Sequence, residues 1–275
     1  MNIEKWMMVL AAASLAAWSC GPRKADAPKV LVLYYSQTSN TKTVAQEIAT
    51  RLGADIEEIV PVNPYDGDFK ATIDRCLQEK AEGILPEVHP LAADLSKYDV
   101  IFLGYPVWFG TFAPPVAAVL DSAAFSGKVV VPFCTFGSGG LDSSAKDLAA
   151  KLPGSEILPG YGVRTARIDA VPVEVDRFLK AYGFIEGEYL APADFPEQQP
   201  VTAEEAAIFD AAVDGYPMLH AKASQVASRT VEDGTEYLFT AIDQPGPDFP
   251  GAPREIKVYV LVENGKAPVF TQVVR

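Results

Sequence analysis

Short apolar runs alternate with longer amphipathic segments from Lys29 to about Tyr182, a pattern typical of a parallel sheet covered by helices. The apolar runs predict strands at 30–35, 54–60, 100–104, 128–134 and 156–163. The amphipathic segments predict helices at 41–52, 69–83, 114–122, 143–152 and 172–182. Five strands interleaved with helices indicate a doubly wound α/β domain, which we place at residues 29–185.

A different pattern follows an irregular stretch at 186–200 that is rich in Pro, Gly and acidic residues and that we interpret as a linker. The chain beyond it predicts one helix at 202–213 and strands at 235–242, 255–262 and 268–274. One helix followed by antiparallel strands indicates a separate small α+β domain at 201–275. We call residues 201–275 the C-terminal domain.

The N-terminus carries an apolar stretch from Trp6 to Trp18, followed by Ser19-Cys20-Gly21. This stretch is too short to span a bilayer but suits the apolar region of a signal peptide. The segment around Cys20 resembles a bacterial lipoprotein signal, in which the cysteine becomes the lipidated first residue. A plain cleaved signal peptide and an amphipathic first helix are the weaker alternatives. We therefore expect a signal peptide at 1–19, a lipid-anchored tether at 20–28, and a location at the cell envelope, on the periplasmic side or the cell surface.

Composition narrows the choice of partners. The 36 acidic and 23 basic residues give a net charge of −13, which disfavours nucleic acid and anionic membrane surfaces. Residues 186–275 alone hold 15 acidic and 6 basic residues, a net charge of −9. We expect a redox partner protein, favoured to be basic, or a small acceptor, with the lipid as the only membrane contact.

Cysteine and histidine usage favours neither disulfides nor metal chemistry. In the mature chain Cys76 and Cys134 are the remaining thiols, and a single pair is no disulfide framework. The two histidines, His89 and His220, fall in different domains without carboxylates at ligand spacing. We therefore expect no metal site and assign no catalytic residue.

The strongest chemical signal lies between the first predicted strand and the first predicted helix, in the segment Y-S-Q-T-S-N-T-K at 35–42. It lacks the glycines of a P-loop and of a dinucleotide fingerprint. Its hydroxyl and amide side chains, with the free N–H groups of a helix start, form an anion cradle, although a simple helix cap remains an alternative. The cradle residues are Ser36, Gln37, Thr38, Ser39, Asn40 and Thr41.

This segment resembles the phosphate loop of flavodoxin-like proteins, Y-S-x-T-G-N-T-K, with Ser39 in place of the usual glycine. The resemblance implies that FMN is the cofactor and that its phosphate lies in this loop. If the backbone at Ser39 must adopt a positive φ, serine there costs free energy that glycine would not.

Two further loops fall at the carboxyl ends of later strands, where open α/β sheets bind ligands. The segment 104–110, G-Y-P-V-W-F-G, resembles the G-x-P-x-W-x-G segment that lies against the flavin in the same family. Trp108 offers a flat face for stacking on the flavin ring, and the alternative is that it is a core tryptophan. The resemblance implies that the backbone at Gly110 moves when the flavin N5 gains a proton. The residues implied to contact the ring are Pro106, Val107, Trp108, Phe109 and Gly110.

The third loop, T-F-G-S-G-G at 135–140, holds three glycines that allow a close approach of the backbone to a ligand. The resemblance implies that Thr135, Phe136 and Gly137 border the ring, with Phe136 either exposed or part of its wall. Because all three loops precede Leu141, we expect the cofactor site to need nothing from the C-terminal domain.

The C-terminal domain is similar to bacterial cystatin-like domains through G-T-E-Y-L-F at 234–239. Of the inhibitory Q-x-V-x-G loop only Gly234 is present, so a docking or spacer role is expected rather than protease inhibition. For the whole protein the leading hypothesis is an FMN-dependent electron carrier. The alternatives are an FMN-dependent NAD(P)H quinone-type reductase and a binding module whose flavin site has decayed.

We predict that Cys20 carries lipid, because it ends an apolar segment and precedes a Gly-Pro tether. Mass spectrometry of protein extracted from membranes should show acyl mass on a chain beginning at Cys20, and Cys20→Ser should remove that mass. A soluble species cleaved at another residue would contradict the prediction.

Overall fold

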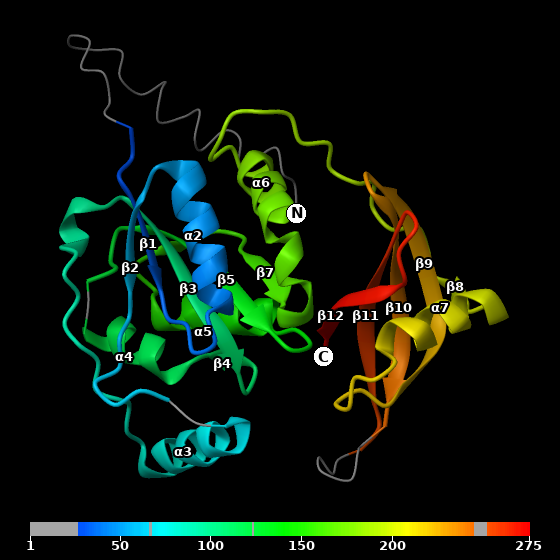
Figure 1. The fold of residues 1–275 in the computed structure, drawn as a ribbon, viewed down its shortest axis with the longest axis horizontal. Coiled ribbons are helices and arrows are strands. Elements are labelled where there is room, and N and C mark those ends of the chain that lie inside the picture. Colours follow the sequence, from blue (N-terminus) through cyan, green and yellow to red (C-terminus); the bar gives the residue numbers. More distant parts are fainter. Residues whose placement is uncertain (1–26, 66–67, 123, 245–251) are drawn as a thin grey trace.

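The computed structural model describes residues 27–65, 68–122, 124–244 and 252–275, which form two sheets lying side by side (Figure 1). The predicted signal peptide and Cys20 lie outside the described residues. In the part of the chain that is described, no helix is long and apolar enough to cross a membrane.

The N-terminal sheet is parallel, with the order β2-β1-β3-β5 and both β6 and β7 beside β5. A short strand, β4, pairs antiparallel with the end of β3. This order confirms the predicted doubly wound α/β fold class. The strands are β1 (Val30–Tyr34), β2 (Asp55–Glu58), β3 (Val100–Trp108), β4 (Thr111–Phe112), β5 (Val129–Phe136), β6 (Glu156–Ile157) and β7 (Tyr161–Arg164).

Helices cover both faces of this sheet. Helices α2 and α6 pack on one face around Val44, Ile48 and Phe178, and α4 and α5 pack on the other around Val116 and Leu148. Both predicted thiols, of Cys76 and Cys134, are buried and free. The helices are α2 (Asn40–Leu52), α3 (Phe69–Glu82), α4 (Pro114–Ser122), α5 (Leu141–Lys151) and α6 (Val171–Ala181), with short 3-10 turns η1 (Leu95–Lys97) and η2 (Thr165–Ala170).

The C-terminal sheet is antiparallel in the order β12-β11-β10-β9-β8, with α7 packed against it. Helix α7 begins at a capping box between Thr202 and Glu205, and its Phe209 packs on Phe239 in the core of this unit. The elements are β8 (Gln199–Pro200), α7 (Ala203–Val213), β9 (Ala221–Val231), β10 (Gly234–Asp243), β11 (Arg254–Glu263) and β12 (Val269–Val274).

Several elements differ from the sequence prediction. Strand β3 continues to Trp108 instead of ending at Gly104 and pairs with β4, which was not predicted, so the segment expected as a loop is mostly a hairpin. The fifth predicted strand is divided into β6 and β7 because Pro159-Gly160 interrupts it, and proline cannot donate to the ladder. Strand β9 was not predicted, since its start, A-K-A-S-Q, is poor in residues with strand propensity. Strand β8 pairs with β9 at the end of the predicted linker.

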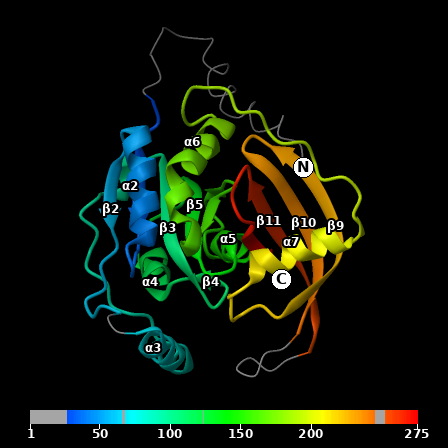
Figure 2. The same cartoon turned by 45° about the vertical axis from the view of Figure 1, so that its right-hand side comes forward.

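The two sheets meet along the outer edge of β12, which lies beside β7 (Figure 1). Figure 2 shows the same two sheets from a second side, with β9, β10 and β11 of the C-terminal sheet labelled. Strand β12 is the edge strand of its sheet, so one row of its backbone groups has no neighbour within that sheet. Part of that row bonds to the N-terminal domain, since the Val273 N–H donates to Ser138 O at 2.6 Å. The C-terminal domain thus contacts the third of the predicted cofactor loops.

Candidate cofactor site

The loop after β1 ends at Ser39, which has φ 66° and ψ −6° and is the N-cap residue of α2. This left-handed backbone meets the condition under which serine replaces glycine at a cost in free energy. The Ser39 side chain makes no capping hydrogen bond. The first N–H groups of a helix lack partners within it, so those of α2 point out of the helix start and suit an anion.

Ser36 supplies the clearest sign of a ligand. Among the described residues, Ser36 Oγ is the one buried side-chain oxygen or nitrogen without a hydrogen-bond partner. A buried hydroxyl left unpaired costs about 1–3 kcal/mol, so folded proteins rarely keep one without a reason. A phosphate oxygen in the loop would provide the missing partner.

The remaining loop residues hold the cradle together. Asn40 Nδ2 donates to Thr38 Oγ1 at 3.0 Å, at the exposed rim. The buried Thr41 hydroxyl lies 2.8 Å from that of Thr135, which joins the first loop to the third. Gln37 was expected to donate a hydrogen bond to the ligand, but its side-chain amide already donates to two groups of the protein.

The Gln37 amide fastens the phosphate loop to the segment before α3. Its Nε2 donates to the backbone oxygen of Tyr65 at 2.8 Å and to Thr72 Oγ1 at 2.8 Å. This places the ring of Tyr65 beside Tyr35 and the loop. Tyr65 was missed in the sequence, where it stands alone in a polar Asn-Pro-Tyr-Asp stretch without periodicity.

Trp108 completes an aromatic wall with these two tyrosines. Its ring is half-buried and meets Tyr35 at 5.8 Å and 89° and Tyr65 at 5.2 Å and 67°, both edge to face. Such pairs contribute about 0.5–1.5 kcal/mol beyond their buried area. Burial raises the pKa of both phenols, so they stay protonated at neutral pH. The tryptophan therefore packs on the core while its remaining surface is free for a ring.

The segment around Trp108 is a hairpin made by β3 and β4, with Val107 opposite Phe112. Phe109 and Gly110 form its tip with φ 52° and 82°, both positive, as a two-residue type I′ turn requires. Phe109 is 62% exposed, which is unusual for so large an apolar side chain. Ser143 Oγ at the start of α5 donates to Gly110 O at 2.6 Å and holds the tip in place.

The third loop lies next to this hairpin, because Pro106 on β3 stands opposite Thr135 on β5. The Phe136 side chain is buried in the core, so this residue offers the site its backbone rather than an exposed ring. Gly137 accepts a hydrogen bond at its oxygen from Arg164 Nε at 2.8 Å. The structure thus brings the three predicted loops together at the carboxyl ends of β1, β3 and β5.

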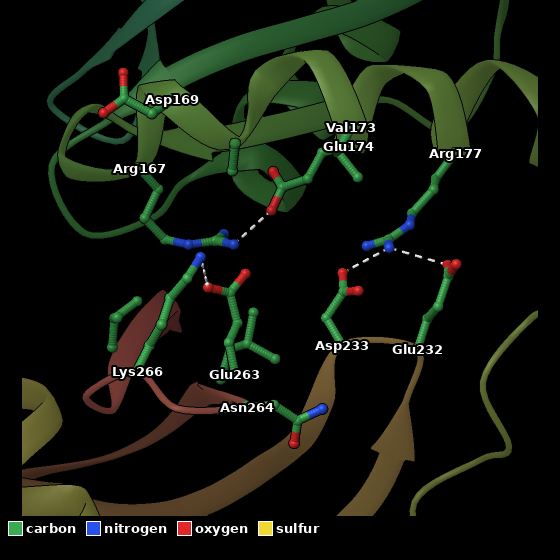
Figure 3. A pocket seen from close by; sticks show the side chains of 13 residues that line it. Arg167, Asp169, Val173, Glu174, Arg177, Glu232, Asp233, Glu263, Asn264 and Lys266 are labelled. Atoms are coloured by element: carbon green, nitrogen blue, oxygen red, sulfur yellow. Dashed lines mark hydrogen bonds and ion pairs between the residues drawn. The ribbon is translucent and has the colours of Figure 1, made fainter.

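A separate cavity of about 630 Å³ lies between η2, α6 and the turns of the C-terminal sheet (Figure 3). None of the residues that line it belongs to the three loops. The cationic side chains that line this cavity already form ion pairs, so the cavity is poorly suited to bind a phosphate. All three cations among the lining residues are paired: Arg167 with Glu174, Arg177 with Asp233 and Glu232, and Lys266 with Glu263.

The family model described as Flavodoxin matches residues 29–180, more than half of the chain. The chain therefore belongs to the flavodoxin family. A protein named NAD(P)H dehydrogenase (quinone) from Azorhizobium caulinodans is 36% identical over 118 residues, 38% of this chain and 55% of the relative. One of the same name from Gluconacetobacter diazotrophicus is 32% identical over 117 residues, with the same shares. This chain spans about half the length of these curated relatives.

Among solved structures, the chain is similar to a flavoprotein in complex with FMN from Lactobacillus acidophilus. The two share 25% identity with a TM-score of 0.46, over 54% of this chain and 98% of the other.

Family membership makes FMN the cofactor of this chain, and the described site fits it. Flavodoxins hold FMN where the strand order reverses, between β1 and β3, which is where the first two loops stand. The unpaired Ser36 hydroxyl and the start of α2 suit the phosphate. The half-buried Trp108 and the exposed Phe109 suit a flat apolar ring.

We predict that Ser39→Gly raises the free energy of unfolding by about 0.5–1 kcal/mol, because the left-handed backbone is strained for serine but not for glycine. Chemical denaturation of the two proteins measures the difference. Thr38→Gly is the matched control, since φ at Thr38 is not positive and glycine there should only loosen the chain. Equal destabilisation by both substitutions would contradict strain at Ser39.

We predict that Trp108→Ala weakens FMN binding by about 1–3 kcal/mol, through lost stacking and burial. Quenching of flavin fluorescence during titration measures the affinity. Trp108→Phe keeps an aromatic edge against Tyr35 and Tyr65 and should lose less. Unchanged affinity for both variants would mean that Trp108 serves the core alone.

Proposed function

We propose that this protein is an FMN-dependent electron carrier at the cell envelope, anchored by lipid on Cys20. The buried, unpartnered Ser36 hydroxyl in the loop between β1 and α2 carries the cofactor part of this proposal. The apolar segment before Cys20 supports the envelope location. The net charge of −13 favours a basic redox partner.

Bound FMN would supply transfer of one or two electrons, and the protein would set its position and surroundings. The N–H groups at the start of α2, with the Ser36 and Thr38 hydroxyls, would bind the phosphate. Trp108 and Phe109 would cover the ring and exclude water from it. The carbonyl of Gly110, held by Ser143, would lie on the hairpin that faces the ring edge.

A second candidate is an NAD(P)H-dependent reductase of quinone-type acceptors. The observation that favours it is the name shared by the two bacterial relatives, NAD(P)H dehydrogenase (quinone), at 36% and 32% identity. That activity requires an acceptor and a nicotinamide to reach the ring. Steady oxidation of NADH or NADPH by the FMN-loaded protein with a soluble quinone favours the reductase, and its failure while a chemical reductant still reduces the flavin favours the carrier.

We predict that the full chain binds FMN at least about tenfold more tightly than riboflavin, because charge-assisted bonds to the phosphate contribute at least 1.5 kcal/mol. Calorimetric titration with the two flavins measures the ratio. Ser36→Ala is the matched variant and should weaken FMN binding while leaving riboflavin unchanged. Equal affinity for the two flavins would refute a phosphate site in this loop.

A further inference from the structure

The 137–140 loop between β5 and α5 is held by the C-terminal domain. The Val273 N–H donates to Ser138 O at 2.6 Å, and Arg275 Nη1 donates to Ser138 Oγ at 3.2 Å. The outer edge of β12 would otherwise present unpaired backbone groups. One backbone hydrogen bond and one side-chain hydrogen bond therefore join the loop to the end of the chain at β12.

One glycine of this loop, Gly139, is required by that contact, and Gly137 lies close to it. A Cβ on Gly139 would lie 2.2 Å from Val273 O, and one on Gly137 would lie 3.0 Å from Tyr216 Oη. Real side-chain carbons do not approach a backbone oxygen to 2.2 Å, so β12 can lie this close to the loop only because residue 139 is a glycine. From the sequence these glycines were expected to admit the flavin, and the structure shows that at least Gly139 serves the C-terminal domain instead.

Arg164, at the end of β7, joins the two domains at the same place. Its Nε donates to Gly137 O at 2.8 Å, and its Nη1 donates to Phe270 O on β12 at 2.8 Å. The guanidinium lies 3.3 Å from the centre of the Phe270 ring and 5.3 Å from that of Tyr216. One rigid side chain thus binds the cofactor loop and the C-terminal strand together.

The surroundings of Arg164 are unusual for a charged group. The residue is 8% exposed, and none of the ion pairs among the described residues includes it. Burial lowers its pKa to about 10, so it remains charged at neutral pH. A buried cation held only by two carbonyls and two aromatic faces depends on both domains being in contact, because either domain alone would leave bonds unmade.

We propose that Arg164 makes the C-terminal domain part of the cofactor site, by holding the 137–140 loop in the conformation that binds FMN. The inference rests on the proposed FMN binding. It replaces the expectation that the cofactor site needs nothing from residues 201–275. Because coupling between two binding events is reciprocal, FMN should tighten the docking of β12 by the factor with which docking tightens FMN.

The test uses the full chain and two variants that disturb the contact in different ways. Arg164→Lys keeps the charge but cannot form the same two-pronged contact with both carbonyls. Val273→Pro removes the N–H donated to Ser138 while Arg164 stays intact, and proline is tolerated at an edge strand. Because Val273 is also buried in the core of the C-terminal domain, circular dichroism first establishes that this variant is folded. Each should raise the FMN Kd by at least about fivefold, the lower end of typical coupling.

Arg177→Gln is the matched control. It removes another contact between the domains, to Glu232 and Asp233, but that contact is partly exposed and lines the separate cavity, which no residue of the 137–140 loop lines. Exposed pairs contribute little, so FMN affinity should stay within about twofold. Reciprocity is read from hydrogen exchange at the Val273 amide, which FMN should slow in the native chain and slow less in Arg164→Lys.

The outcomes separate this inference from the proposed function. If the native chain binds FMN and both variants match it within about twofold, the coupling is refuted while FMN binding stands. If the native chain does not bind FMN, both are refuted. Weaker FMN binding in Arg164→Lys and Val273→Pro but not in Arg177→Gln, with slower exchange at Val273, would support the coupling.

Discussion

The reversal of strand order at β1 is the constraint on which the site depends. From β1 the chain turns back through α2 to β2, and from β3 it runs the other way through α4 to β5. Right-handed crossovers in opposite directions place the two helices on opposite faces, as the separate packing of α2 and α4 shows. The loops after β1 and β3 therefore diverge, and the crevice between them takes the flavin.

Hydrophobic periodicity was sufficient to predict the doubly wound fold class, whereas the order of the strands in the sheet comes from the structure. Buried strands such as β3 and β5 are continuous apolar runs, and helices such as α6 carry a clear apolar face, so their existence and order along the chain could be predicted. The prediction failed where local signals were weak. Strand β9 is rich in small and polar residues, and it forms because β10 pairs along its whole length.

The parts of the candidate site that consist of consecutive residues could be predicted from the sequence. The parts that depend on contacts between residues far apart in the sequence could not. The hydroxyl-rich loop and the segment around Trp108 are each contiguous in the sequence, so both could be singled out, and the structure brings them together. Tyr65 and Arg164 are single residues whose neighbours, Trp108 and Phe270, are distant in sequence. The glycines of the 137–140 loop show a related ambiguity. The sequence indicates that some group approaches the backbone closely there, but it does not indicate whether that group is a ligand or another part of the chain.

The account makes FMN the resident cofactor of a site built by three loops. The most direct measurement is the visible absorbance of the full chain purified without added flavin, followed by mass analysis of whatever acid releases. We predict a yellow protein that releases FMN, or an apo-protein that keeps a flavin spectrum after incubation with FMN and removal of the unbound flavin by gel filtration. A protein that is colourless as purified and still colourless after the same incubation and gel filtration would contradict FMN binding and would leave a binding module with a decayed flavin site.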